Sequence, residues 1–428
     1  MRCLHTTTYE IKYSDQPWFK TQGYATLSHR WASTEVLFHE ITQHAEELRQ
    51  ATVNRRHAVA GLDKILGACI TAQELSIEWM WIDSCCINKT DSTELVESIN
   101  SMYAWYKDAR VCITYLGDVT RDLKDPADPS SPAIFYDERT GKRSVWFTRG
   151  WTLQELLAPS AMRFYDADWN YFGTKLELAV PISQITGISV SYLNGTTHFR
   201  EACIATKMSW MAGRETTREE DMAYSMAGVF NVNMNVQYGE GHKAFMRLQH
   251  ALISKNDESL FAWKMPPGVT DEYEYRSPIP TVELGPYEWG LLAASPAWFA
   301  GCGAMSTHSS RGVVRHRGGF TLTPQGISGP IGRRDHYTAA VLSGLTVVGL
   351  IPYHMWLKAR EKTTLRYSLN CWDETAPGTA KAVQVLLRPV SRNPAVFVRT
   401  DCQTYELVHS VKNTTYSMVG TVMQPELY

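Results

Sequence analysis

Short apolar segments alternate with longer amphipathic segments along the first part of the chain, and this alternation restricts the possible folds most strongly. The apolar segments that predict strands are 24–28, 79–83, 111–117 and 162–166. One amphipathic segment that predicts a helix begins near Glu35, and two longer ones cover 57–77 and 92–109. Strands that are joined through helices pair in parallel. The sequence therefore predicts an α/β fold with βαβ units around a parallel sheet.

Length and composition predict more than one globular domain. The chain has 428 residues, of which 44% are hydrophobic and 20% are charged. Amphipathic helices are predicted from about residue 200, and short Thr/Val/Leu runs broken by glycine follow after about residue 280. We predict an α/β domain over 1–199, a helical extension over 200–265 and a mostly β C-terminal domain over 266–428.

Charge and residue spacing argue against several classes of protein. A net charge of -2 gives no reason to expect nucleic acid or an anionic membrane as the main partner. The longest apolar run, 338–351, is shorter than a membrane span and predicts buried strands. The nine cysteines form no C-x-x-C pair and the thirteen histidines show no zinc-ligand spacing, so we expect no metal site. Without an apolar N-terminal segment, the protein is expected to be cytoplasmic.

Glu155 lies in the segment 149–159, "RGWTLQELLAP", among residues that favour a core. Thr152 and Glu155 fit the capping box S/T-x-x-E, in which the glutamate reaches back to the backbone at the start of a helix. Trp151 and Glu155 are also four residues apart, a spacing that places an indole and a carboxylate on one helix face. The segment therefore predicts either a helix cap or a binding site.

Polar residues follow the predicted strands at the ends that share one edge of a parallel sheet. Ser28, His29, Arg30 and Trp31 follow the first strand, and Asp83 follows the second. Ligands of such sheets bind beyond the carboxyl ends of the strands. These residues are therefore candidates for a small-molecule site.

Each of these candidates also has a structural interpretation. His29 and Arg30 suit a phosphate or a carboxylate but also a surface ion pair. Trp31 either stacks on a base or closes the end of the sheet. Asp83 either caps the next turn or orders Arg30 across the strand ends. Cys85, with His29 as its base, is a weaker candidate for a nucleophile.

Three blocks of the sequence together resemble the fungal heterokaryon incompatibility (HET) domain. They are "YATLSHRW" at 24–31, the segment 81–118 that begins "WIDSCCINKT", and "WFTRGWTLQELLAP" at 146–159. The segment 214–253 resembles the region that follows these blocks in many such proteins, so the resemblance covers about residues 1–265. One departure is Ala32, where the family often has glycine.

The resemblance carries expectations for fold and function. The HET domain is similar to the Toll/interleukin-1 receptor (TIR) domain, a doubly wound parallel sheet. Enzymatic TIR domains use a glutamate to cleave the nicotinamide glycosidic bond of NAD, and the "GWTLQELL" block maps that glutamate onto Glu155. The resemblance thus implies a vegetative-incompatibility effector that hydrolyses NAD or NADP as substrate, without a cofactor. Trp31 or Trp151 would stack on the base, and Arg30 would meet the phosphates.

Two other functions remain open. We expect no separate nucleotide-binding or repeat module of the kind that such effectors often carry, and the chain is rich in aromatic residues. A HET scaffold recruited as a cofactor-free biosynthetic enzyme, for example a cyclase that acts on a terpenoid or polyketide, is the alternative. The third possibility is a non-catalytic signalling module that associates with itself or with other HET or TIR-like domains.

Overall fold

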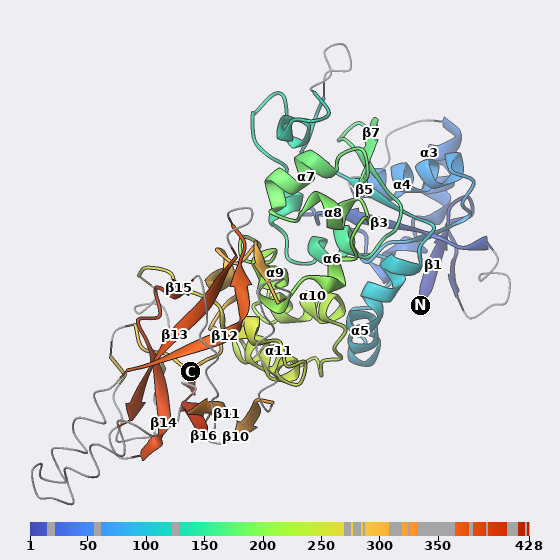
Figure 1. Cartoon of the computed structure of the whole chain (residues 1–428). Coiled ribbons are helices and arrows are strands. Elements are labelled where there is room, and N and C mark those ends of the chain that lie inside the picture. The colour runs from blue at the N-terminus through green and yellow to red at the C-terminus, as the bar shows by residue number, and fades with distance from the viewer. Residues whose placement is uncertain are drawn as a thin grey trace, which may run out of the picture. The chain divides into compact units, whose positions relative to one another are not determined.

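The computed structural model divides the chain into two compact units, which are described separately (Figure 1). The first comprises Met1–Glu201 and Arg214–Gly239, and the second comprises Ala202–Gly213 and Glu240–Tyr428. The structure describes residues 1–14, 22–54, 61–121, 128–268, 275–276, 284–285, 287–307, 319–323, 326–332, 364–375, 380–390, 393–408, 418–423 and 426–427.

The described residues of the first unit contain a sheet with the strand order β2-β1-β4-β3-β5-β6-β7. Its central strands are β4 (Trp79–Trp81), β3 (Ala25–His29), β5 (Val111–Tyr115) and β6 (Met162–Tyr165). These central strands are parallel, as the sequence predicts. The edge strands are β1 (Arg2–His5), β2 (Ile11–Tyr13) and β7 (Tyr171–Thr174), and they pair antiparallel.

The sheet is therefore wider than the sequence predicts, because antiparallel strands extend its parallel centre at both edges. β2 and β7 have only three and four residues, and most of their side chains are exposed or half-buried. Short strands of this kind lack the apolar runs from which the central strands were predicted. The first unit is a mixed α/β structure with a parallel centre.

The strand order reverses at β3 and thereby fixes the positions of the crossover helices. Helix α4 (Leu62–Glu74) joins β3 to β4, and α5 (Ser92–Asp108) leads back from β4 to β5 on the other side of β3. Because parallel crossovers are right-handed, this reversal places α4 and α5 on opposite faces of the sheet. In sheets of this order, ligands bind at the carboxyl ends of the strands that flank the reversal, here β3 and β5.

Helix α5 shows how the sequence specifies these helices. The carboxylate of Asp91 accepts hydrogen bonds from the backbone N–H groups of Thr93 and Glu94 and caps the helix. Its buried residues recur at the spacing of one helical face and include Ile99, Met102, Tyr103 and Tyr106. The cap and this apolar stripe explain why the sequence prediction at 92–109 is confirmed.

The remaining helices of the first unit surround this centre. The α-helices are α2 (Phe38–Ile41), α3 (Ala45–Asn54), α6 (Thr152–Leu157), α7 (Ala179–Thr186), α8 (Val190–Leu193) and α10 (Asp221–Phe230). The 3₁₀ helices are η1 (Pro132–Phe135), η2 (Val145–Thr148) and η3 (Phe199–Glu201). Helix α6 contacts α5, α10 and β3, so these elements pack together beside the sheet.

The second unit is largely β-structure, as the sequence predicts. Its larger described sheet has the order β10-β11-β16-β14-β13-β12-β9, and β15 also pairs with β13. These strands are β9 (Met305–Ser306), β10 (Thr321–Thr323), β11 (Gly326–Gly332), β12 (Leu365–Asp373), β13 (Lys381–Val390), β14 (Asn393–Thr400), β15 (Glu406–Val408) and β16 (Met418–Met423). A separate pair joins β8 (Tyr275–Arg276) to β17 (Glu426–Leu427). The strands predicted at 338–351 lie outside the described residues.

The predicted helices between residues 200 and 265 divide between the two units. Helix α10 belongs to the first unit, whereas α9 (Ile204–Ser209) and α11 (Lys243–Ile253) belong to the second, together with η4 (Glu258–Phe261) and η6 (Pro296–Phe299). A packed aromatic group of Trp263, Trp289 and Trp298 lies in the core of the second unit. Among the residues that the structure describes, no helix is long and apolar enough to cross a membrane.

Candidate functional site

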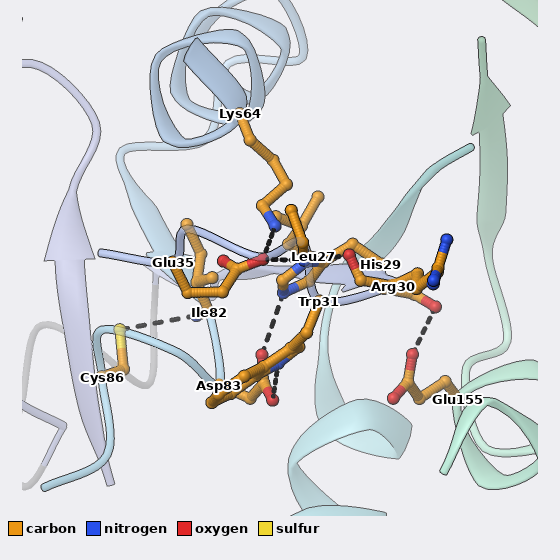
Figure 2. A network of polar contacts seen from close by, with 12 residues as sticks. Leu27, His29, Arg30, Trp31, Glu35, Lys64, Ile82, Asp83, Cys86 and Glu155 are labelled. Atoms are coloured by element: carbon orange, nitrogen blue, oxygen red, sulfur yellow. Dashed lines mark hydrogen bonds and ion pairs between the residues drawn. The ribbon is translucent and has the colours of Figure 1, made fainter. Parts of the chain in front are cut away.

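Acidic residues follow three of the central strands of the first unit at one edge of the sheet. Asp118 follows β5 and accepts hydrogen bonds from the segment that begins η2, and Asp166 closes the turn between β6 and β7. These two carboxylates therefore have local structural roles. Asp83 follows β4, and the contacts that hold it come from side chains of other segments (Figure 2). Of these three acids, Asp83 is therefore the candidate for a functional site.

Three side chains surround Asp83. Nε2 of His29 lies 2.9 Å from Oδ1, and the indole N–H of Trp31 donates to Oδ2 at 2.8 Å. Nζ of Lys89 lies 3.8 Å from the carboxylate and 3.4 Å from the centre of the Trp31 ring. Burial alone would raise the pKa of Asp83, but Lys89 and the hydrogen bonds from His29 and Trp31 lower it well below its usual value. Asp83 is therefore ionised throughout the neutral range.

Glu155 lies on α6 and is buried, with 7% of the residue exposed. The hydroxyl of Ser28 donates to its Oε2 at 2.5 Å, and the indole N–H of Trp146 donates to the oxygen of Ser28 at 2.9 Å. Helix α6 begins at Thr152 with Trp151 at its N-cap, and no side chain caps it. The hydroxyl of Thr152 donates instead to backbone carbonyls of the preceding turn. The capping-box interpretation of Glu155 is therefore wrong, and its carboxylate faces β3.

The environment of Glu155 favours its neutral form. Burial raises the pKa of Glu155 to about 8, and the charge of Asp83 acts in the same direction. Hydrogen bonds from Ser28 and Tyr106 and the charge of Arg214 lower the pKa but do not cancel the effect of burial. A carboxyl group that titrates near neutral pH is suited to proton transfer and is common at functional sites.

The loop that carries Arg214 is held against the start of α6. Nη1 of Arg214 donates to the hydroxyl of Thr152 at 2.9 Å, and the backbone N–H of Gly150 donates to the carbonyl of Glu215 at 2.8 Å. A Cβ atom at Gly150 would lie 2.4 Å from Cγ2 of Thr216, so the close approach of the two segments requires glycine. This contact keeps the positive charge of Arg214 near Glu155.

Trp151 is directed to a different acid. Its side chain hydrogen-bonds to Asp221, the first residue of α10, which also accepts from the hydroxyl of Tyr238 at 2.9 Å. Burial raises the pKa of Asp221, and these hydrogen bonds oppose that shift. Of the two indoles proposed to stack on a base, Trp31 lies beside Asp83 and is 38% exposed, whereas Trp151 is half-buried.

The predicted residues do not all face the same side of the sheet. Ser28 and His29 are consecutive in β3, so their side chains point to opposite faces. Ser28 contacts Glu155. His29 contacts Asp83 at the strand end (Figure 2). Arg30 is exposed, and the described contacts of Asp83 do not include it. The site thus consists of a buried Ser28–Glu155 part and a more open part around Asp83.

The nucleophile hypothesis for Cys85 receives no support. Cys85 is completely buried, and a hydrogen bond with Cys86 together with burial raises the pKa of its thiol well above the usual value. Such a thiol is not ionised near neutral pH. Within the described part of the chain, no group of three or more His, Cys, Asp or Glu side chains is arranged to hold a metal ion.

Several residues of the site were not predicted. Trp146 and Tyr106 lie within the blocks that resemble the HET domain but were not named as candidates, and Lys89 follows Asp83 by six residues without a local pattern. Arg214 reaches Glu155 only through the fold. The proximity of Trp146 to the "RGWT" block was the one local signal for its role.

The fold and the site define an α/β protein with a buried glutamate and an ionised aspartate at the carboxyl edge of its sheet. Residues 24–139 match the family model described as "Heterokaryon incompatibility protein (HET)", so the predicted family is confirmed and the chain carries a HET domain. Glu155 lies beyond the matched residues.

A comparison with curated proteins supports the same family. The chain is 40% identical over 250 residues to "Vegetative incompatibility protein HET-E-1" of Podospora anserina. The aligned region covers 58% of this chain and 17% of that protein, so the chain spans less than a fifth of its relative. No solved structure matches the chain.

Proposed function

We propose that the first unit is a TIR-like NAD(P) glycohydrolase domain of the vegetative-incompatibility class. The observation that carries this proposal is the environment of Glu155. It is a buried carboxyl group at the carboxyl edge of a parallel sheet, with a pKa of about 8, held by the hydroxyl of Ser28. The similarity to a vegetative incompatibility protein supports the biological class.

The proposed reaction uses Glu155 as an electrostatic and proton-accepting group. The bond between ribose C1′ and the pyridinium nitrogen of NAD breaks, and its electron pair leaves with neutral nicotinamide. Positive charge develops on the ribose, and an ionised Glu155 stabilises it. A water molecule then adds to C1′ and loses a proton, giving ADP-ribose. The reaction thus consumes one water and releases one proton.

The charge of the substrate provides a way to ionise Glu155. An isolated buried carboxylate is unfavourable, so Glu155 holds a proton when no ligand is present. The cationic nicotinamide ring would lower the pKa of a nearby carboxyl group. Binding of NAD would then release the proton and generate the charged form only in the complex.

The open part of the site suits the remainder of the nucleotide. Trp31 offers a partly exposed indole, and Lys89 covers it as a cation. This arrangement favours a neutral adenine over a second cationic ring. The exposed Arg30 next to Trp31 is positioned to meet phosphate groups. His29 and Asp83 orient the indole.

Product analysis tests the proposal. Purified protein is incubated separately with NAD and NADP, and the products are separated by chromatography and identified by mass. The proposal expects nicotinamide with ADP-ribose or its phosphorylated form. Formation of AMP and nicotinamide mononucleotide would show cleavage at the diphosphate instead. If a folded sample releases no nicotinamide from either substrate, the glycohydrolase proposal is wrong.

A further inference from the structure

The loop after β3, residues 30–36, is attached to helix α4 by a buried ion pair (Figure 2). Glu35 Oε1 contacts Nζ of Lys64, and the two side chains are 5% and 10% exposed. The same oxygen accepts a hydrogen bond from the backbone N–H of Ala32 at 2.6 Å. One carboxylate thus joins the loop both to itself and to the helix.

The same loop also lies close to the start of α4. Gly61 is the N-cap of this helix and has a φ of +95°. A Cβ atom at Gly61 would lie 3.0 Å from the carbonyl oxygen of Thr34. Glycine is therefore needed both for the backbone conformation and for the close approach of the loop. The ion pair thus attaches the loop to α4, and Gly61 allows the loop to lie close to the start of that helix.

Stability alone is a weak reason for a buried ion pair. The cost of removing two charges from water is often as large as their attraction, so apolar pairs of similar size are frequently at least as stable. What the pair does provide is a defined position for the loop. Trp31 lies at the start of this loop, and Lys89 covers its ring. Burial lowers the pKa of Lys89, and the charge of Glu35 is among the effects that oppose this shift.

We propose that Glu35 and Lys64 are positioning residues that hold Trp31 ready to stack on the base of the nucleotide. The essential element is the carboxylate oxygen that accepts from Ala32, and Lys64 fixes that oxygen. This inference rests on the proposed function, because it takes Trp31 as the base-binding residue. Fixing the loop before binding avoids the entropic cost of ordering it in the complex.

Two double variants separate the positioning role from a stabilising one. Glu35→Gln with Lys64→Met removes both charges but keeps an oxygen acceptor for the N–H of Ala32. Glu35→Met with Lys64→Met removes the charges and the acceptor. Neither double variant leaves an unpaired buried charge, so both are expected to fold, whereas single replacements would leave one.

The first measurement requires neither a ligand nor enzymatic activity. Hydrogen exchange of the Ala32 amide is compared in the wild type and in the two double variants. We expect protection to be retained with Glu35→Gln/Lys64→Met and lost with Glu35→Met/Lys64→Met. The second measurement is the affinity for ADP-ribose by calorimetry. We expect the affinity for ADP-ribose to be about tenfold weaker in the second variant only. In cleavage of NAD, that variant should change KM more than kcat.

The possible outcomes are distinct. Equal exchange and equal ADP-ribose affinity in both variants would overturn the positioning role. Unfolding of both variants at the same reduced Tm, with no difference between them, would show that the pair serves stability only. If the wild type binds no ADP-ribose and releases no nicotinamide, the proposed function fails, and the exchange data still decide whether Glu35 fixes the loop.

Discussion

The hydroxyl of Ser28 on β3 donates a hydrogen bond to Glu155 on α6, across 127 positions of the sequence. Ser28 also accepts a hydrogen bond from the indole N–H of Trp146, so its hydroxyl links Trp146 to Glu155. The Ser28 hydroxyl donates its single proton to the carboxyl group. This arrangement favours the ionised form of Glu155 and opposes the effect of burial.

Ser28→Ala should raise the pKa of Glu155 further above 8, because it removes the donor that stabilises the carboxylate. The acid limb of kcat/KM against pH should move to higher pH. Stability should fall by about 1–3 kcal/mol, since the buried N–H of Trp146 loses its acceptor. The pH profile and denaturant unfolding measure these effects.

Ser84→Ala is the matched control for this change. Ser84 is also buried, and among the described residues its hydroxyl has no hydrogen-bond partner. The control should therefore leave the pH profile unchanged and should not reduce stability by a comparable amount. Equal effects of the two variants would contradict a special role for Ser28.

Asp83→Asn should shift the same limb in the opposite direction. The negative charge of Asp83 contributes to the raised pKa of Glu155, so its removal should lower that pKa. The acid limb of kcat/KM should then move to lower pH, even if the rate at its maximum falls. A shift to higher pH, as expected for Ser28→Ala, would show that the charge of Asp83 does not act on Glu155.

Glu155→Gln should change how stability depends on pH. The folded pKa of about 8 exceeds the ordinary value of 4.5, so the native state holds a proton that the unfolded chain has lost between these values. The contribution of Glu155 to stability is therefore fully present below about pH 4.5 and falls as pH rises toward 8, by up to about 1.4 kcal/mol per pH unit. The variant lacks this decline.

Denaturant unfolding at about pH 5 and about pH 8 measures the difference. The stability of Glu155→Gln relative to the wild type should increase between the two values. A relative stability that does not change with pH would mean that Glu155 titrates normally.

Trp31→Ala should weaken binding of ADP-ribose by about tenfold or more, because stacking of a base on an aromatic ring contributes about 1–3 kcal/mol. Tm should change little, since Trp31 is 38% exposed. Tyr171→Ala removes an aromatic ring that is 42% exposed on β7 and serves as the control. Equal affinities of the two variants in calorimetry would remove Trp31 from the site.

The central strands and the strand-end residues were predictable because both depend on local patterns. A buried parallel strand reads as a short apolar run, and the residue after it marks the sheet edge. From these two signals the sequence predicted β3 to β6 and placed Ser28, His29 and Asp83 at that edge. The antiparallel edges β2 and β7 carry no such run and were missed.

The contacts of the site could not be predicted, because they join distant segments. The capping box at Thr152 and Glu155 is a local pattern, but in the structure the carboxyl group of Glu155 contacts Ser28 instead. The ion pair between Glu35 and Lys64 depends on how α4 packs against the loop after β3. No spacing in the sequence encodes that contact.

The most direct test of the account compares nicotinamide release from NAD by Glu155→Gln and by a matched variant, Glu258→Gln. Glu258 lies in the second unit and is buried to a similar extent, with 9% exposed against 7% for Glu155. The account predicts that Glu155→Gln loses at least about 100-fold in rate while it stays folded, and that Glu258→Gln retains activity. Undiminished release by a folded Glu155→Gln protein would contradict the central claim.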